Sequence, residues 1–182
     1  AKKSLGQLVK RKTLKANGIF AIYPARKTGP EDLTLFSDEN LNNELFTWIG
    51  LRQQTKKPNG GKNKSLADFV KPILDNKNDY LGVFFVTVDG VEKVTMSLED
   101  EQNDYEAIMV KALADRLVEA FAECLHKLVR QEYWGYAREE KLSQEQLVEE
   151  SYQGIRPAPG YPACPDHSIK PVIAKCLNAQ EI

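Results

Sequence analysis

The sequence predicts an α+β fold with a mainly antiparallel sheet, because strand signals gather in the first half of the chain and helical signals in the second. The strand signals are short apolar or alternating runs at residues 18–25, 32–38, 45–52 and 79–90. The strongest helical pattern begins only after residue 103. Strands and helices therefore do not alternate regularly, which argues against a parallel βαβ sheet.

The first elements follow a basic stretch at residues 1–17, which we expect to form a short helix or an ordered arm. An Asn17-Gly18 turn signal ends this stretch. The runs GIFAIYPA and DLTLFSD come next, and the segment RKTGPE between them contains a Gly29-Pro30 turn signal. This order predicts a pair of strands.

The next segments alternate between strand and loop signals. LFTWIGLR continues the strand pattern, and KKPNGGKNK after it is typical of an exposed loop. SLADFVKP predicts a short buried turn or strand start that ends at Pro72. The run DYLGVFFVTVDG, rich in β-branched and aromatic residues, is the strongest strand signal, and we expect it to lie at the centre of the sheet.

Two helices are predicted in the second half of the chain. The first has Asn103 or Asp104 as its N-cap and extends to about residue 136. The second begins at Ser143, where Ser143 and Gln146 form a capping-box pattern, and runs towards Gly154. Apolar residues at helical spacing predict a stripe on the first helix that covers the sheet: Ile108, Met109, Ala112, Leu113, Leu117, Phe121, Leu125 and Leu128.

Composition limits the classes of protein. A chain of 182 residues with 42% hydrophobic and 28% charged residues, and a net charge of -1, suits one globular domain and no nucleic-acid partner. Three cysteines and the absence of a leader pattern disfavour secretion, so we expect a cytoplasmic protein. No apolar run approaches the roughly 18 residues that a membrane span requires, so no membrane partner is expected.

Familiar catalytic and metal motifs are missing from the sequence. The glycines form neither a dinucleotide-binding pattern nor a phosphate loop. Cys164 and His167 supply two of the four ligands that a structural zinc needs, and Cys176 is the only third nearby, so no metal site is expected. His126 lies within the predicted long helix, where a solvated or hydrogen-bonded histidine is the favoured interpretation. No catalytic residue is therefore assigned.

Two features remain as candidates for binding. Asp115, Glu119 and Glu123 form a row on the long helix, which predicts a solvated face or, alternatively, an acidic wall for a cationic ligand. The second feature is the segment GIRPAPGYPACPDH, whose four prolines predict a rigid, extended backbone. There Arg156 suits a carboxylate, and Gly160 lets a flat ligand approach the main chain. A strap packed on the core is the structural alternative.

Several long motifs in the same order resemble the activation domain of cobalamin-dependent methionine synthase. They are GLRQQTKKP, SLADFV, IMVKALADRLVEAFAECLH, YWGYA and GIRPAPGYPACPDH. The resemblance covers about residues 18–167 and implies a C-shaped α+β domain over residues 18–182, with a twisted antiparallel sheet and flanking helices. It also implies binding of S-adenosylmethionine.

The resemblance implies a role in repair of an oxidised cofactor. Cobalamin is held by a partner module, and its inactive cob(II)alamin state is methylated reductively in methionine biosynthesis. The methyl group comes from S-adenosylmethionine, and the electron comes from flavodoxin or an equivalent reductase. The expected partners are therefore a cobalamin-binding module or protein and this reductase.

The same resemblance assigns site residues. It implies that Arg156 binds the methionyl carboxylate, the backbone of Ala158 meets the adenine, Gly160 allows close approach, and Tyr161 lies near the sulfonium. Asp32, with Glu31 beside it, matches an acidic partner in the loop after the first strand. Two further acidic residues near the ligand are implied at Glu119 and Glu150.

Two departures from the family pattern bear on function. After His167 the sequence SIKPVIAKCLNAQEI does not follow the family, so part of the ligand pocket is expected to be absent. The homocysteine, folate and cobalamin modules are also absent from these residues. Two hypotheses follow: a reactivation module that binds S-adenosylmethionine, or a docking protein for a cobalamin domain that has lost this ligand.

Overall fold

The computed structural model describes residues 2–72 and 78–179. Within this part the chain forms two compact units. The first contains residues 2–19 and 85–138, and the second contains residues 20–72, 78–84 and 139–179. The predicted arm at residues 1–17 and domain at residues 18–182 also include residues 1, 73–77 and 180–182, which lie outside the described residues.

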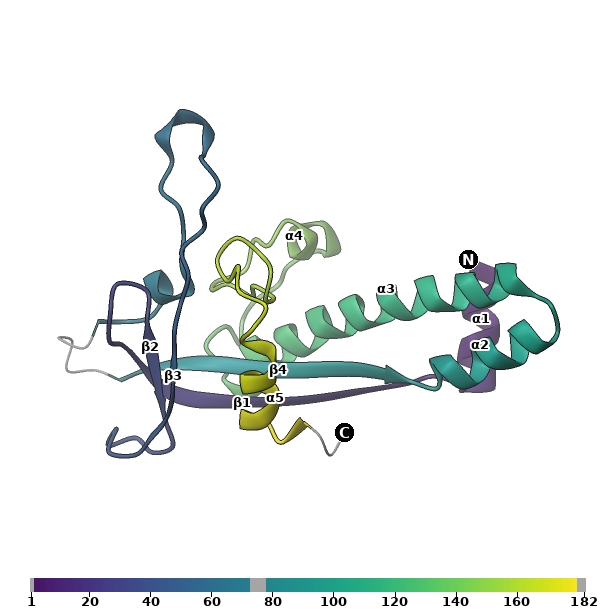
Figure 1. Ribbon diagram of the computed structural model, residues 1–182, viewed down its shortest axis with the longest axis horizontal. Coiled ribbons are helices and arrows are strands. Elements are labelled where there is room, and N and C mark those ends of the chain that lie inside the picture. The colour runs from purple at the N-terminus through teal and green to yellow at the C-terminus, as the bar shows by residue number, and fades with distance from the viewer. Residues whose placement is uncertain (1, 73–77, 180–182) are drawn as a thin grey trace. The chain divides into compact units, whose positions relative to one another are not determined.

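The described strands form a four-stranded sheet in the order β3-β2-β1-β4 (Figure 1). Its strands are β1 (Lys15–Lys27), β2 (Leu33–Phe36), β3 (Glu44–Trp48) and β4 (Asp79–Asp89). β1 pairs antiparallel with β2, and β2 pairs antiparallel with β3. Together with the helices, this sheet confirms the predicted α+β class.

The prediction that the strand at residues 79–90 lies centrally is wrong. β4 is an end strand of the described sheet, with β1 as its neighbour. Val83 alone is buried among the 11 residues of β4, so the strand has the burial of an edge rather than of a covered centre. β-branched and aromatic side chains suit any half-buried pleated surface, and their number therefore does not reveal a strand's position in the sheet.

The second unit has a core that joins the sheet to segments far apart in sequence. Strands β1 to β3 and the 3-10 turn at Leu66–Phe69 contribute most of it, and two residues come from the C-terminal part of the chain. The buried members are Ala25, Leu33, Leu35, Trp48, Leu66, Ala67, Val70, Cys164 and Ile169. Because this core draws on both ends of the unit, it can hold distant loops in fixed positions.

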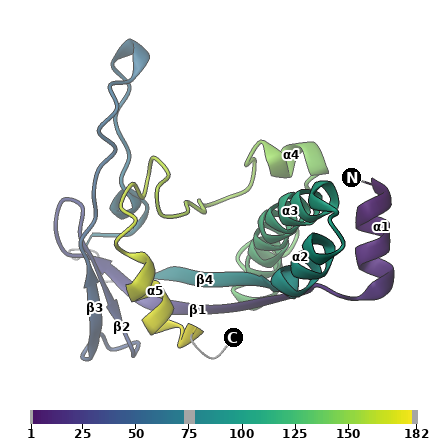
Figure 2. The same ribbon diagram turned by 45° about the vertical axis from the view of Figure 1, so that its right-hand side comes forward.

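A short C-terminal helix that the sequence reading did not include, α5 (Lys170–Cys176), lies against β1 in both Figure 1 and Figure 2. The Tyr23 hydroxyl donates a hydrogen bond to the carbonyl of Cys176 at 2.9 Å. Burial first, and then the nearby Cys176, raises the pKa of Tyr23. The residues after His167 thus include a helix that packs on the sheet.

The first unit consists mainly of helices α1 (Lys2–Arg11), α2 (Val91–Asp100) and α3 (Asp104–Leu128). The predicted N-cap of the long helix is confirmed, because the Asn103 side chain accepts a hydrogen bond from the N–H of Glu106 at 3.3 Å. Helix α2, absent from the sequence prediction, packs along α3. No helix in the described part of the chain combines the length and apolarity of a membrane span.

The predicted apolar stripe of α3 is only partly correct. Leu125 is buried as expected, but Ile108 is 66% exposed and Ala112 is exposed. The buried apolar face instead runs through Ala107, Val110, Ala114, Ala122 and Leu125. Apolar residues occupy adjacent faces of this helix, so periodicity alone did not decide between them. The α-helix also ends at Leu128 and continues as a π-helical turn, Val129–Tyr133, rather than running to residue 136.

The predicted capping box at the next helix is confirmed. The Ser143 hydroxyl accepts from the N–H of Gln146 at 3.3 Å, and the Gln146 side chain accepts from the N–H of Ser143 at 2.8 Å. The helix α4 (Gln144–Val148) is nevertheless short and does not reach Gly154. Glu150 adopts a positive φ of 55°, a left-handed conformation that ends a right-handed helix.

Candidate ligand-binding site

Residues 158–164 of the proline-rich segment fold into two consecutive turns, so the prediction of an extended backbone is wrong for these residues. In the proline loop, residues 156–164, the N–H of Tyr161 donates to the carbonyl of Ala158 at 3.0 Å. The N–H of Cys164 donates to the carbonyl of Tyr161 at 2.8 Å, and the N–H of Gly160 donates to the carbonyl of Cys164 at 2.8 Å. Pro-Gly at the two central positions of the first turn is the signature of a type II turn.

Gly160 has a structural reason to be glycine. Its φ is +102°, a conformation that side-chain-bearing residues rarely adopt. A Cβ at this position would also lie 2.5 Å from Cε1 and Nε2 of His167. The His167 imidazole therefore covers the face of Gly160 where a side chain would project. A ligand that contacts this face of Gly160 has to displace the exposed His167 ring.

The proline loop brings four of the predicted site residues together. Ala158 and Gly160 are exposed, and Tyr161 is 63% exposed. Arg156 is half-buried. The loop therefore presents main-chain groups and an aromatic side chain beside a guanidinium, which is a set of groups able to contact a carboxylate and a flat ring.

The acidic loop, residues 28–32, contains the predicted carboxylates and connects β1 to β2. It is closed by a hydrogen bond of 3.0 Å from the N–H of Thr28 to the carbonyl of Asp32. The Asp32 carboxylate accepts from the N–H of Gly50 at 3.2 Å. Asp32 and Glu31 are both half-buried. The two carboxylates have different partners: Asp32 accepts from a backbone N–H, whereas Glu31 accepts from the side chain of Arg52.

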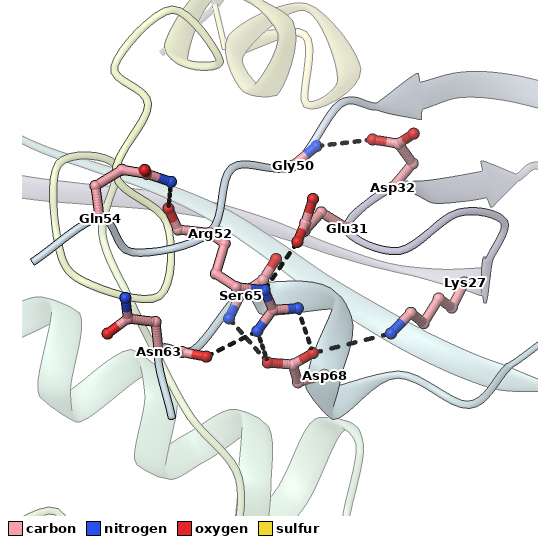
Figure 3. A network of polar contacts seen from close by, with 9 residues as sticks. All are labelled: Lys27, Glu31, Asp32, Gly50, Arg52, Gln54, Asn63, Ser65 and Asp68. Atoms are coloured by element: carbon pink, nitrogen blue, oxygen red, sulfur yellow. Dashed lines mark hydrogen bonds and ion pairs between the residues drawn. The ribbon is translucent and has the colours of Figure 1, made fainter. Parts of the chain in front are cut away.

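Arg52 forms a compact network of polar contacts that we call the brace (Figure 3). Its Nε donates to Glu31 at 2.8 Å, and its two terminal nitrogens donate to the Asp68 carboxylate at 2.6 and 2.8 Å. One of these nitrogens also donates to the carbonyl of Asn63 at 2.8 Å. Lys27 lies 3.8 Å from Asp68. The brace thus connects the acidic loop to two other segments of the second unit.

The brace changes the acidity of its members. The hydrogen bonds from Arg52 hold the pKa of the Asp68 carboxyl well below its ordinary range, and the bond from the N–H of Ser65 acts in the same direction. Bonds to Asp68 and Glu31 raise the pKa of the Arg52 guanidinium. Arg52 and Asp68 therefore each favour the charged form of the other. The brace brings two basic side chains, Lys27 and Arg52, against two acidic ones, Glu31 and Asp68.

A common core anchors the acidic loop and the proline loop. Leu33 follows Asp32 and is fully buried in the core of the second unit. Ile155, which precedes Arg156, packs against that core, and Cys164 at the end of the proline loop belongs to it. Burial raises the pKa of the Cys164 thiol, with Asp166 contributing further. The two loops are therefore anchored on the same core of the second unit.

Two predicted acidic residues lie outside this pair of loops. Glu150 is exposed at the left-handed position after α4, in the second unit. Glu119 belongs to the first unit, where it is exposed and accepts a hydrogen bond of 2.7 Å from Arg116. The exposure of Asp115 and Glu119 fits the solvated-face interpretation of the helix row, while Glu123 is half-buried. A ligand contact for Glu119 or Glu150 stays a prediction.

Three of the residues considered as catalytic or metal-binding candidates are buried or half-buried: His126, Cys164 and Cys176. His126 is buried, and the Arg130 guanidinium donates to its Nδ1 at 2.8 Å, so this histidine is hydrogen-bonded as the favoured interpretation predicts. Cys164 is buried and Cys176 is half-buried. Among the described residues, no three or more histidine, cysteine, aspartate or glutamate side chains gather in a way that could hold a metal ion.

Comparisons with known proteins agree with this architecture. Residues 1–182 match the family described as "Vitamin B12 dependent methionine synthase, activation domain". The chain is also similar to a crystal structure of the MetH reactivation domain bound to AdoHcy, with 48% sequence identity and a TM-score of 0.89. The alignment covers 97% of this chain and 54% of that structure, so the chain spans about half its length.

The fold, the order of the motifs and these matches define the class: the chain belongs to the activation-domain family of vitamin B12-dependent methionine synthase. This confirms the resemblance drawn from the sequence. The brace was not recognised as part of the site at the sequence level. GLRQQTKKP, which contains Arg52, contributed only to the resemblance, and no local pattern in it predicts partners at Glu31 and Asp68.

Proposed function

We propose that this chain binds S-adenosylmethionine at the proline loop and thereby supports the reductive methylation of cob(II)alamin held by a partner module. The observation that supports the proposal most is that Ala158 and Gly160 are exposed in the same loop as the half-buried Arg156. The relative bound to AdoHcy, which is the demethylated form of this ligand, supports the same assignment.

The groups present fit the ligand. The planar fork of Arg156 suits the methionyl carboxylate, and main-chain groups at Ala158 suit the edge of the adenine ring. Tyr161 offers its exposed ring near the sulfonium, where a cation over an aromatic face is stabilised. Asp32 is the proposed partner of the ammonium group. Glu119 and Glu150 are proposed as further acidic neighbours of the positively charged ligand.

The chain's proposed contribution to the reaction is positioning. The methyl group comes from the sulfonium sulfur of S-adenosylmethionine, and one electron comes from flavodoxin or an equivalent reductase. Holding the ligand in one orientation beside the cobalt centre lowers the entropic cost of the transfer. The proposal requires no acid or base from this chain.

Calorimetric titration with S-adenosylmethionine and with AdoHcy tests the proposal. Wild-type protein should give a saturable heat at submillimolar ligand. Arg156→Gln should weaken binding about tenfold or more, since a charge-assisted bond to the carboxylate is lost. Arg11→Gln, at an exposed position in α1, is the matched control and should not change affinity.

Absence of a saturable heat with either ligand in the wild-type protein would contradict the proposal. The docking hypothesis would then be favoured if the same preparation still bound a cobalamin module. Equal affinities of wild type and Arg156→Gln would contradict the assignment of Arg156 while leaving the ligand itself supported.

A further inference from the structure

We propose that Arg52 is a positioning residue for the amino-acid end of the ligand. By occupying Glu31, its guanidinium leaves Asp32 as the carboxylate that pairs with the ligand's ammonium group. This inference rests on the proposed function, since it concerns the same site. It assigns a task to the brace and decides between two neighbouring acids that sequence reasoning left as alternatives.

The first step concerns Glu31. Its carboxylate lies 2.8 Å from Nε of Arg52, and the Glu31 and Arg52 side chains are 35% and 31% exposed. The same guanidinium uses both terminal nitrogens on Asp68. A carboxylate that is already neutralised by a well-oriented guanidinium gains less from a second cation. Glu31 is therefore the weaker candidate for the ammonium group.

The second step concerns Asp32. One of its oxygens accepts from the neutral N–H of Gly50 at 3.2 Å. Within residues 2–72 and 78–179, no lysine, arginine or histidine forms an ion pair with this carboxylate. Its negative charge is therefore hydrogen-bonded without being neutralised. A half-buried carboxylate in this state favours a nearby cation, such as an ammonium group.

The third step links the two acids. Gly50 and Arg52 lie two residues apart in the segment after β3, so one short stretch of chain holds Asp32 through a backbone N–H and Glu31 through a side chain (Figure 3). The acidic loop and the segment after β3 pack closely, since a Cβ on Gly50 would collide with the carbonyl of Glu31. Displacement of Arg52 should therefore shift both acids together.

The geometry also explains why arginine is needed at this position. Its Nε contacts Glu31 while its terminal nitrogens contact Asp68, so a single planar group spans two carboxylates. A lysine ammonium is a point charge and cannot make this set of bonds. Arg52→Lys keeps the charge and removes the bridge, which makes it the informative substitution.

The experiment compares two ligands in calorimetric titrations. AdoHcy contains the ammonium and carboxylate groups, whereas 5′-methylthioadenosine keeps the adenosine and the thioether without them. Asp32→Asn and Glu31→Gln form a matched pair, because each amide oxygen can still accept the hydrogen bond made in the wild type. Asp32→Asn should weaken AdoHcy about tenfold, and Glu31→Gln by about twofold or less.

Arg52→Lys should also weaken AdoHcy, by about fivefold to tenfold, and leave 5′-methylthioadenosine within about twofold of wild type. A role in folding alone would weaken both ligands equally. Combined with Asp32→Asn, it should cause little additional loss of AdoHcy affinity, since both changes remove the same contact. Thermal unfolding of each variant, followed in parallel, reports whether it is folded at the titration temperature.

Each outcome decides a separate point. Equal losses for the two ligands, or a larger effect of Glu31→Gln than of Asp32→Asn, would overturn the inference while wild-type binding of AdoHcy upheld the proposed function. No binding of AdoHcy by the wild type would overturn the proposed function, and the inference with it. If Arg52→Lys does not fold, the Asp32 and Glu31 pair still decides which carboxylate serves the ammonium group.

Discussion

The brace and the proline loop belong to the same unit and are anchored on the same core, yet different forces hold them in shape. The brace depends on charge-assisted side-chain bonds that join residues 16 and 21 positions apart. The proline loop depends on backbone hydrogen bonds within seven residues, 158–164, and on prolines with fixed φ. One region is therefore held by ion pairs between residues distant in sequence, and the other by local backbone geometry.

This difference teaches how each region should respond to change. Charge-assisted bonds weaken when a carboxylate is protonated or when one partner is shortened. Backbone turns respond instead to substitutions that alter the allowed φ and ψ angles. A variant can therefore perturb one region while leaving the other intact.

The largest expected effect is from Gly50→Ala. The added Cβ meets the backbone carbonyl of Glu31, which no side-chain rotation can relieve, so we expect a loss of about 3 kcal/mol in the free energy of unfolding. Gly61→Ala is the matched control, because the φ of Gly61 is -57° and its nearest contacts are ordinary. Urea denaturation measures both. Equal stabilities of the two variants would show that the acidic loop adapts freely.

Gly160→Ala should destabilise the protein by about 2 kcal/mol, because alanine disfavours a φ of +102°. The His167 ring in its path can move, since this histidine is exposed. The double variant with His167→Ala should recover the steric part of the loss and keep the part due to φ. Full recovery in the double variant, measured by urea denaturation, would mean that backbone strain contributes nothing.

Asp68 gives the brace a pH dependence in the acid range, whereas the proline loop contains no aspartate or glutamate. Its folded-state pKa is lowered from 3.8, chiefly by Arg52, so its stabilisation is complete above that value and is lost as the pH falls towards the folded pKa. The stability of the wild type should therefore decrease more steeply than that of Asp68→Asn between about pH 4 and pH 2. Urea denaturation across this range checks it. If the free energies of unfolding of the two proteins change with pH in parallel, Asp68 does not cause the pH dependence.

Pro162→Ala should have the smallest effect. Pro162 is exposed at the second position of the turn from Tyr161 to Cys164, where its fixed φ reduces the freedom of the unfolded chain. Its replacement should lower the free energy of unfolding by about 0.4–1 kcal/mol and AdoHcy affinity by less than about threefold. A larger loss of affinity without a loss of stability would indicate that the proline contacts the ligand.

The predictable parts of the structure were those with local causes. Asn103 and Ser143 were recognised as N-caps because each bonds to the backbone only three residues further on. The α+β class followed from the order of the strand and helix signals. The two caps depend on neighbours within one turn, and the class depends on the order of the elements along the chain. A single sequence contains both.

The parts of the structure that the sequence did not predict depend on distant partners, or on local patterns that favour two different conformations. The bonds of Arg52 to Glu31 and Asp68 follow no helical or strand spacing, so nothing near Arg52 indicates them. The four prolines of residues 157–165 predict an extended chain, whereas the Pro159-Gly160 order within them favours a turn. The edge position of β4 depended on which strands pair with β1. The ligand contacts of the seven assigned residues stay predictions.

A crystal structure of this chain with AdoHcy tests the central claim most directly. We predict that Arg156 lies within hydrogen-bond distance of the ligand carboxylate and Asp32 within hydrogen-bond distance of its ammonium group. The bond between Arg52 and Glu31 should be unchanged. A ligand bound away from the proline loop, or an ammonium group paired with Glu31 after release of Arg52, would contradict the account.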